Sequence, residues 1–496
     1  MIKAGFVSAL ALSFALLPDA PAEPPGSAGG AIPARPEQIR FEPLAFEVPD
    51  PGPMRHRVAG VPVYVAEDHA LPLVDVTVLL RAGAFLDPPG REGLAAMTAT
   101  LVRRGGTARR GAAELEEAVE ALAARIDSTA GDAYATVSLN CLSSRLDEAL
   151  DLLFEMIAEP AFEPGAVEAE KRRMVAAMRP RNDEPGRILD REWVWLLYGR
   201  DHVAGRYPTA PSVAPVSQSD LAAFHARSWS PANMVLAVSG DVDRKAVLAR
   251  LEARLAAWKK RGRPVAWPPP PSGHRPVPGL YGVDKEAPQA QVVIGRLAPA
   301  WEGRWDDRGR YAALVADQTL GGGDFSSRLM SRLRTREGLV YGVRSELGIG
   351  ALWPEPFEVR FAAAPANVAR AVAGVFDELR RLRDERVGAG ELETAKSLLL
   401  AELADTFGSA RKTAATFALD EVLGRPHAFW RGYRARLLAV TPADVEAAAR
   451  RSLNPEEMLI LVVGSGSRVS AGDAARALPA PRLLPLRDPL TLAPLP

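Results

Sequence analysis

Two stretches of the sequence decide the fold: Ser217–Gly240 (SQSDLAAFHARSWSPANMVLAVSG) and Thr441–Gly464 (TPADVEAAARRSLNPEEMLILVVG). They align without gaps at a shift of 224 residues. Each begins with Ser or Thr, which are favoured helix N-caps. Each then has the apolar spacing of an amphipathic helix, a turn at Ser-Pro or Asn-Pro, and an apolar strand-like run that ends in Gly. This repeat predicts a tandem duplication of one domain.

A second pair of matching segments lies earlier in each half. Leu94–Met97 with Gly105-Gly106 corresponds to Tyr311–Leu314 with Gly322-Gly323, at a shift of 217 residues. Alternating or apolar runs predict strands over 61–66, 73–81 and 133–139, and two apolar stripes with helical spacing predict helices. The stripes are Leu115, Val119, Leu122 and Ile126, and then Leu146, Leu150, Leu153, Phe154 and Ile157. The predicted class is α+β, with two homologous tandem domains, each a largely antiparallel sheet with helices packed on one face.

Composition excludes several classes of function. The chain has 496 residues, 47% of them hydrophobic, so it is long enough for two or more packed domains. Its 61 basic residues balance its 61 acidic residues, which argues against nucleic-acid binding. Cys141 is the only cysteine, so disulfides within the chain and cysteine-based metal sites are excluded. The six histidines are scattered and form neither His-x-x-x-His nor His-x-x-Glu-His.

Proline-rich breaks and an apolar leader predict the division of the chain. Lys3, the apolar run Gly5–Leu17 and Ala20-Pro21-Ala22 are typical of a secretory signal peptide. We therefore expect export, to the periplasm or beyond if the source is bacterial, and no membrane span in the mature chain. The predicted segments are a signal peptide (1–22), a flexible lead-in (23–40), an N-terminal domain (41–258), a Pro-rich linker (259–278), a C-terminal domain (279–475) and a Pro-rich tail (476–496).

Several short motifs lie in a fixed order and spacing along the chain. They are Gly83-Ala84-Phe85 with Gly93-Leu94-Ala95, Gly105-Gly106-Thr107, Tyr198-Gly199 with His202 and Gly205-Arg206, Ser230–Met234 leading to Gly240-Asp241, and LGGGDFSSRL (320–329) with LRTREGLVYGV (333–343). In this order and spacing the chain resembles the insulinase family of zinc metallopeptidases, which includes the pitrilysin-type and mitochondrial-processing-peptidase-like proteins. The resemblance extends over nearly the whole mature chain.

The resemblance implies a degenerate zinc site. Family members carry His-x-x-Glu-His on the helix after Gly-Leu-Ala, with two imidazoles on one helix face and a glutamate as general base. Here Ala96 and Thr100 stand in place of the histidines, and Ala99 stands in place of the glutamate. The distal glutamate ligand best matches Glu170, which without its partners is expected to be an ordinary helix carboxylate. We therefore expect no metal and no zinc-dependent catalytic residue in this chain.

The C-terminal half keeps a different family motif. In family peptidases an arginine and a tyrosine seven residues apart reach the substrate near the scissile bond, and Arg334 and Tyr341 match those positions. A guanidinium and a phenol can hold the carbonyl oxygen of the scissile peptide as negative charge develops on it. The alternative is that Arg334 is one surface cation among several and that Tyr341 belongs to the core.

The resemblance implies a non-catalytic, substrate-binding subunit of a heterodimer. A homologous partner with an intact motif would supply the zinc, and peptides or unfolded polypeptides would be the substrate, bound as an added strand at a sheet edge. One alternative is a stand-alone peptide-binding or structural scaffold of the same fold. A remote alternative is an active peptidase with other catalytic groups, although no Gly-x-Ser-x-Gly elbow or phosphate loop is found.

Overall fold

The computed structural model describes residues 46–258, 262–267, 273–299, 307–323, 325–466 and 480–495. The chain divides into two units, Met1–Ala45 and Phe46–Pro496, and all of the described residues lie in the second. The predicted signal peptide (1–22) and lead-in (23–40) lie outside the described residues, as do parts of the predicted linker and tail. None of the described helices is long and apolar enough to cross a lipid bilayer.

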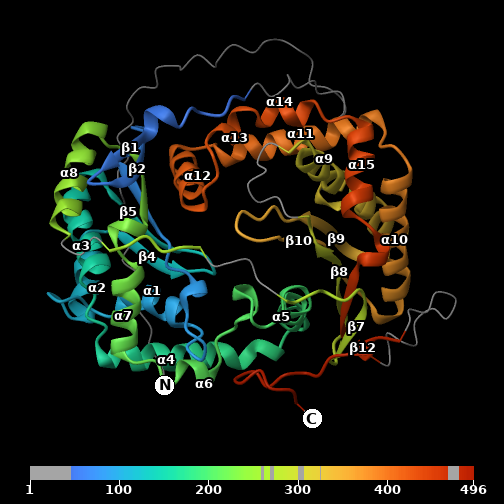
Figure 1. The fold of residues 1–496 in the computed structure, drawn as a ribbon, viewed down its shortest axis with the longest axis horizontal. Helices are drawn as coiled ribbons and strands as arrows, with labels where there is room; N and C mark the ends of the chain where they lie inside the picture. Colours follow the sequence, from blue (N-terminus) through green and yellow to red (C-terminus); the bar gives the residue numbers. More distant parts are fainter. Residues whose placement is uncertain are drawn as a thin grey trace, which may run out of the picture. The chain divides into compact units, whose positions relative to one another are not determined.

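The N-terminal half contains one six-stranded sheet and its helices (Figure 1). The strands are β1 (Arg55–Val58), β2 (Val61–Glu67), β3 (Leu73–Leu80), β4 (Arg125–Ala130), β5 (Ala135–Leu142) and β6 (Met234–Gly240). The helices are α1 (Leu94–Arg104), α2 (Ala112–Ala121), α3 (Leu146–Ala158), α4 (Pro164–Met178), α5 (Pro185–Tyr198), α6 (Ala210–Val213), α7 (Gln218–Ser228) and α8 (Arg244–Ala257).

The C-terminal half contains a second six-stranded sheet. Its strands are β7 (Gly279–Asp284), β8 (Ala290–Leu297), β9 (Val340–Leu347), β10 (Pro356–Ala363), β11 (Leu459–Gly464) and β12 (Arg482–Leu483). The α-helices are α9 (Arg308–Asp317), α10 (Val368–Asp384), α11 (Ala389–Thr406), α12 (Ala410–Leu423), α13 (Ala428–Arg431), α14 (Tyr433–Leu438) and α15 (Pro442–Ser452). Two π-helical segments, η8 (Gln318–Gly322) and η9 (Met330–Arg336), precede β9.

The two sheets share one topology, which confirms the predicted fold class. Their strand orders are β1-β2-β6-β3-β5-β4 and β12-β7-β11-β8-β10-β9. In each sheet the second and third strands of this order are parallel, and the following three pairings are antiparallel. Only the first edge strand differs in origin, because β1 forms a hairpin with β2 whereas β12 comes from the end of the chain.

The repeated stretches of sequence form the same local structure in both halves. In α7, the amide of Ser217 donates to Asp220 (2.8 Å) and the amide of Asp220 donates to the Ser217 hydroxyl (3.2 Å). In α15, Thr441 and Asp444 form the same reciprocal pair at 2.8 and 3.3 Å. Two capping boxes 224 residues apart satisfy helix amides that would otherwise lack partners, and so they start both helices at equivalent positions.

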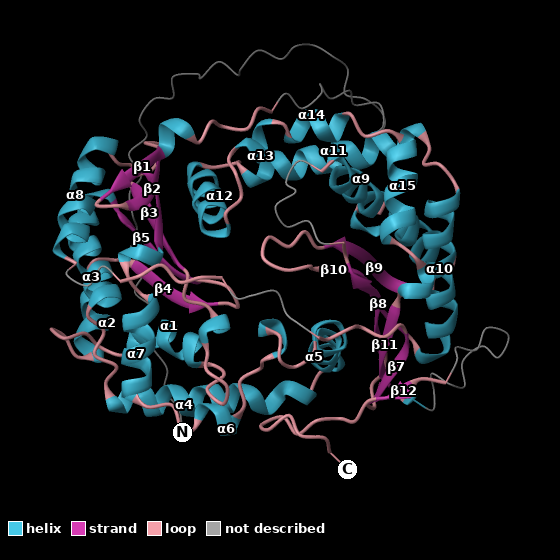
Figure 2. Cartoon of the chain, viewed as in Figure 1, coloured by secondary structure: helices cyan, strands magenta, loops and turns pink. Residues whose placement is uncertain are grey.

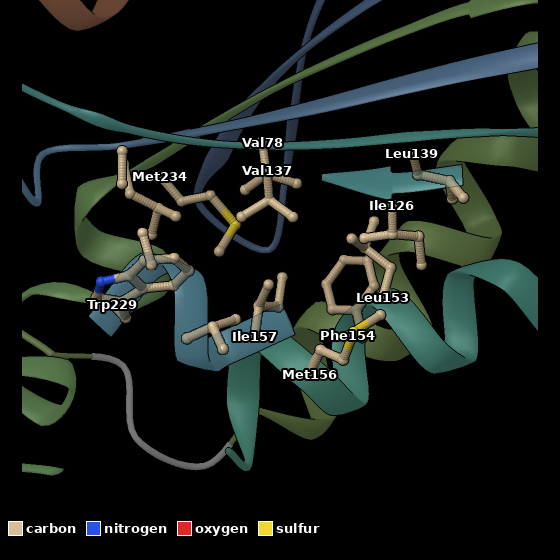
Figure 3. Close-up of a cluster of buried hydrophobic side chains, with 14 of the residues drawn as sticks. Val78, Ile126, Val137, Leu139, Leu153, Phe154, Met156, Ile157, Trp229 and Met234 are labelled. Carbon is tan, nitrogen blue, oxygen red and sulfur yellow. The ribbon is translucent and has the colours of Figure 1, made fainter. Parts of the chain in front are cut away.

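One predicted helix is shorter than its apolar stripe indicated. α2 ends at Ala121, the chain turns at Ala123 with a positive φ of 48°, and Ile126 lies on β4. Ile126 is nonetheless buried in the N-terminal core, where it lies near Leu139 and faces α3 (Figure 3). The assignment of Ile126 to the helix was therefore wrong, because one buried position fits a strand facing the core as well as it fits a helix.

Each sheet is covered on its second face by a helix from the other half of the sequence. Because strand side chains alternate between faces, Val63 and Val65 join the core of their own half, whereas Tyr64 packs with Phe417 and Ala418 of α12. In the other half, Val293 and Leu461 pack with Ile188, Leu189 and Trp193 of α5. The two exchanged helices, α5 and α12, are labelled in Figure 2. Each has 14 residues. The halves are therefore interlocked.

The C-terminal segment and part of the linker contact the body of the protein. β12 pairs with β7, and the Arg487 guanidinium then reaches the buried Glu192 carboxylate on α5 (3.2 Å). The Asn233 side chain binds the predicted linker, because it accepts the amide of Val265 (2.6 Å) and donates to the Arg263 carbonyl (3.0 Å). Asn233 of the Ser-Pro-Ala-Asn motif thus fixes the chain that leaves the N-terminal half.

Candidate functional site

α1 is the helix that matches the zinc-binding helix of the family. The residues at its two ligand positions and at its general-base position have no group suited to those roles. Ala96 and Thr100 lie on one partly exposed face because they are four residues apart, and Ala99 is fully buried. The buried Asp87 carboxylate accepts the amides of Gly93 and Ala95 at 2.8 Å each, so it caps the start of α1. Burial raises the pKa of Asp87 to about 7.

Glu170 lies on α4 and is engaged by an arginine. Its side chain is 5% exposed, and the Arg173 guanidinium one turn later donates to it with an Nε–Oε2 distance of 2.6 Å. A carboxylate held in this bidentate way already has a cationic partner. Among the described residues, no group of three or more His, Cys, Asp or Glu side chains could hold a metal ion. The residues present at this site therefore do not fit a zinc ion.

The histidines and the cysteine have structural surroundings. His202 accepts the Ala204 amide on Nδ1 (3.1 Å), and the ring of His225 contacts the Ile157 carbonyl through Nε2 (3.0 Å). Both rings thus contact main-chain groups rather than other candidate metal ligands. Cys141 is buried on β5, and burial raises the pKa of its thiol to about 11. The thiol therefore stays protonated at neutral pH and is a poor nucleophile.

The structure brings Arg334 and Tyr341 together at the surface of the C-terminal half. Arg334 lies on η9 and Tyr341 on β9, and the guanidinium carbon lies 4.9 Å from the centre of the Tyr341 ring. Tyr341 is 84% exposed, so it does not belong to the core. Between η9 and β9 the chain turns at Gly338, which has a positive φ of 62°. This turn folds the seven-residue interval back on itself.

Arg334 differs from the arginines around it. Arg332 is bound by Glu337, Asp377 and Glu378, and Arg344 pairs with Glu346. In contrast, within the described part of the chain Arg334 has no ion pair, and its contacts are with aromatic rings. The second ring is Phe325, which is 58% exposed and lies 4.5 Å from the Arg334 guanidinium carbon. Sequence reasoning missed Phe325, although an aromatic residue beside a Gly-rich segment was a visible signal.

The segment before this pair is held by a buried carboxylate. Asp317, at the end of α9, receives the Ser345 hydroxyl (2.6 Å) and the Leu347 amide (3.3 Å) from β9. Burial raises the pKa of Asp317 to about 7. A Cβ atom on Gly321 would lie 2.7 Å from the Ser345 amide nitrogen, so the Gly-rich segment allows η8 to approach the edge of β9. Asp317 and Gly321 thus hold the end of α9 and η8 against β9, close to the segments that carry Arg334 and Tyr341.

The remaining motif residues connect these elements to one another. Arg206 donates to the Ala84 and Asp87 carbonyls (3.1 and 3.0 Å), and a Cβ atom on Gly83 would lie 2.4 Å from the Asp132 carbonyl oxygen. The Gly-Ala-Phe and Gly-Arg motifs therefore serve packing.

A cavity of about 530 Å3 lies between the β4–β5 turn, the β9–β10 loop and the end of α12, lined by Tyr134, Trp353 and other residues.

Comparison with known proteins identifies the family. Residues 63–192 match the family described as insulinase (peptidase family M16), and residues 215–399 match the peptidase M16 inactive domain, so the two matches together cover more than half of the chain. A Mycobacterium leprae protein named an uncharacterized zinc protease is 29% identical over 302 residues, which are 59% of this chain. A Helicobacter pylori protein named a non-peptidase homolog is 28% identical over 291 residues, which are 58% of this chain.

The chain spans 65% and 64% of the length of these two relatives. The crystal structure of a peptidase M16 inactive domain from Pseudomonas fluorescens has the same fold, with a TM-score of 0.73 and 24% identity over 83% of this chain and 97% of that one. With the family matches, the duplicated α+β fold and the substituted positions on α1 in view, the chain belongs to the insulinase family, as a member without the zinc motif and its catalytic centre.

Proposed function

We propose that this chain is the non-catalytic, substrate-binding subunit of an exported heterodimeric zinc peptidase. A homologous partner with an intact His-x-x-Glu-His motif would hold the zinc, and this chain would supply Arg334 and Tyr341. One observation carries the proposal: Arg334, in contact with the exposed Tyr341, forms no ion pair with any of the described residues, in a chain whose zinc-helix positions are Ala96, Ala99 and Thr100.

The chemistry of the pair suits a peptide near its scissile bond. The Arg334 guanidinium is always charged, and the Tyr341 hydroxyl is a donor on a ring that is 84% exposed. Together they can donate to the carbonyl oxygen as it gains negative charge, which is the role of an oxyanion hole. Neither group is a nucleophile or a metal ligand here, so bond cleavage has to come from the partner.

The edges of the two sheets favour binding of an extended peptide at β4. The register of β4 with β5 turns the main-chain groups of Ser128 and Ala130 away from β5, and within the described residues these groups have no hydrogen-bond partner. The outer edge of β9 is covered instead, because Val343 donates to the Met330 sulfur and Leu347 donates to Asp317. An open edge provides the main-chain hydrogen bonds that hold a peptide without strict sequence demands.

A second candidate function is a stand-alone peptide-binding or structural scaffold. The name of the H. pylori relative, a non-peptidase homolog, favours it. A scaffold needs neither a half-buried arginine that lacks an ion pair with the described residues nor an exposed tyrosine, and each costs side-chain entropy to hold in place. The two candidates therefore differ in whether peptide hydrolysis by the complex with a partner depends on Arg334 and Tyr341.

The test is zinc content and peptide hydrolysis, measured on the purified chain alone and mixed with a homologue from the same source that carries the intact motif. We expect the chain alone to be free of stoichiometric zinc and inactive, and the mixture to cleave peptides. In the mixture, Arg334→Ala is expected to lower kcat by about 10²–10³-fold, as loss of an oxyanion donor does, and Tyr341→Phe is expected to lower it as well. Arg336→Ala, two residues from Arg334 and exposed, is the matched control.

Three results would contradict the proposal. Zinc binding and hydrolysis by the chain alone would mean that α1 does not correspond to the zinc-binding helix of the family. Full activity of the mixture with Arg334→Ala would favour the scaffold. Complex formation without any hydrolysis, in a mixture whose partner binds zinc, would also favour the scaffold.

A further inference from the structure

The Arg334 guanidinium lies over two exposed aromatic rings. Its central carbon is 4.5 Å from the centre of the Phe325 ring and 4.9 Å from the centre of the Tyr341 ring. Both rings are largely exposed, at 58% and 84%, although exposed aromatic side chains are costly in water. Phe325 precedes η9 and Tyr341 is the second residue of β9, so separate segments supply the two rings. This cluster of Phe325, Arg334 and Tyr341 is called the aromatic clamp below.

The aromatic clamp limits how Arg334 can meet a ligand. A guanidinium is planar, with its five N–H donors in the plane and two faces that stack on aromatic rings. Where both faces are stacked, only the edge that carries the N–H groups is open. No carboxylate among the described residues pairs with that edge. The edge therefore remains available to oxygen atoms that lie in the plane of the guanidinium.

We propose that Phe325 is a positioning residue that holds Arg334 flat against Tyr341, so that the guanidinium binds planar oxygen ligands of a peptide through its edge. This inference rests on the proposed function and adds a third residue to its site. The ligand chemistry is a carbonyl or carboxylate oxygen in the guanidinium plane. Its source is either a main-chain carbonyl within the peptide or the free carboxylate at the end of the peptide.

The experiment measures peptide binding to the full mature chain by fluorescence anisotropy. The probe is a fluorescein-labelled nonapeptide of alanine and glutamine, prepared with an amidated and with a free carboxyl terminus. The variants are Phe325→Leu, which keeps an apolar side chain but removes the ring, and Phe325→Tyr, which keeps the ring. Leu71→Ala is the matched control, because Leu71 is 63% exposed and lies in the N-terminal half. Thermal unfolding of each variant accompanies the binding measurement.

A second readout follows the guanidinium itself. Ring currents from two stacked aromatic rings shift the NMR resonance of the Arg334 Nε–H group, which is assigned by its loss in Arg334→Lys. Phe325→Leu removes one ring, so the resonance is expected to move, and Phe325→Tyr should leave it nearly in place. A merely structural role for Phe325 would change thermal stability without this local shift.

We expect Phe325→Leu to weaken binding of the probe about tenfold, as the loss of a well-placed charged hydrogen bond does, with an unchanged melting temperature. Phe325→Tyr is expected to bind within about twofold of wild type, since it keeps the ring. If Phe325→Leu weakens binding of both forms of the probe equally, the edge of the Arg334 guanidinium binds a main-chain carbonyl within the peptide. If it weakens binding of the free-acid form alone, the edge binds the terminal carboxylate.

The outcomes that overturn the inference differ from those that overturn the proposed function. If Phe325→Leu binds like wild type while Arg334→Ala does not, the inference fails and the proposed function stands. If Phe325→Leu weakens binding without moving the Arg334 resonance, Phe325 contacts the peptide directly and the positioning role is wrong. If Arg334→Ala and Tyr341→Phe both bind like wild type, the proposed function fails and the inference fails with it.

Discussion

The two halves of the molecule share their strand order but differ at α1 and its counterpart α9, which follow the equivalent strands β3 and β8, and in the segments after these helices. In the N-terminal half, α1 carries no metal ligand at Ala96, Ala99 or Thr100, and on the outer edge of β4 the main-chain groups of Ser128 and Ala130 have no hydrogen-bond partner among the described residues. In the C-terminal half the equivalent helix ends in Asp317 and continues into η8, which covers the edge of β9 and leads to Arg334 and the exposed Tyr341. The duplicated scaffold is thus constant, and short segments on it determine the chemistry.

The same comparison holds for the exchanged helices. α5 covers the sheet of the C-terminal half, and α12 covers the sheet of the N-terminal half, each with a large aromatic side chain that is almost fully buried. These residues are Trp193, which is 1% exposed, and Phe417, which is 0% exposed. Because each helix covers the sheet of the other half in the same way, we expect α5 and α12 to contribute similarly to the free energy of unfolding.

The largest effect is expected from truncating these two residues. Trp193→Ala and Phe417→Ala each leave a cavity between a sheet and a helix from the other half, so each should lower the free energy of unfolding by about 3–5 kcal/mol. Trp193→Ala also removes the indole hydrogen bond to Glu358 (2.8 Å). Urea unfolding followed by far-UV circular dichroism measures both. Leu438→Ala, at a residue 44% exposed on α14, is the control and should stay within about 0.5 kcal/mol of wild type.

A large effect in one variant and a negligible effect in the other would break the comparison. It would mean that one sheet keeps its stability without the helix from the other half, and that only one half depends on the exchange.

A second prediction concerns one buried carboxyl in each half, Asp87 and Asp317. Burial raises both pKa values to about 7, whereas an unfolded Asp titrates near 3.9. Between about pH 4 and pH 7 the unfolded chain has released a proton that the folded chain keeps. The free energy of unfolding should therefore fall as pH rises through this window, by at most about 1.4 kcal/mol per pH unit for each group.

Asp87→Asn and Asp317→Asn should each flatten this dependence, since an amide does not titrate. The measurement is urea unfolding at half-unit steps from pH 4 to pH 8, expressed as the difference between variant and wild type. Differences that do not change with pH would show that the carboxyl concerned is already ionised in the folded protein at pH 4.

A third prediction concerns the glycine that lets η8 approach β9. Gly321→Ala places a Cβ atom 2.7 Å from the Ser345 amide nitrogen, so the backbone has to shift, and we expect a loss of about 1–3 kcal/mol of stability. Gly390 on α11 has no atom within 4 Å of the position of an added Cβ. Gly390→Ala should therefore raise stability by up to about 1 kcal/mol, because alanine favours the helix. A neutral Gly321→Ala would mean that η8 does not need its close contact with the strand.

The smallest effect is expected from restoring part of the zinc motif. Ala96→His with Thr100→His places two imidazoles on one partly exposed face of α1, and such a pair binds zinc. At a zinc concentration ten times the dissociation constant, the gain in stability is about 1.4 kcal/mol. Thermal unfolding with and without zinc sulfate measures it, and the single variant Ala96→His is the control. If zinc stabilises the double variant no more than the single one, the two positions do not share a face.

Local features of the fold could be predicted from the sequence, and long-range features could not. The capping boxes at Ser217 and Thr441 depend on residues three apart, so their sequence pattern was sufficient to locate both helices. The apolar stripe of α5 indicates burial but not which sheet buries it, because the partner residues lie beyond position 279. For the same reason the stacking of Phe325 on Arg334 could not be predicted, since spacing along the chain does not give the orientation of a ring.

The exchange of helices has a consequence for the order in which the chain is made. The Tyr64 hydroxyl of β2 donates to Glu421 of α12 at 2.7 Å, across 357 residues of sequence. At a synthesis rate of about 5–20 residues per second, roughly 20–70 s pass between the emergence of these two residues from the ribosome. During that interval one apolar face of the first sheet has no cover from its own half, which exposes it to aggregation. The nascent chain therefore gains from a chaperone, or from delayed folding, until its last third has been made.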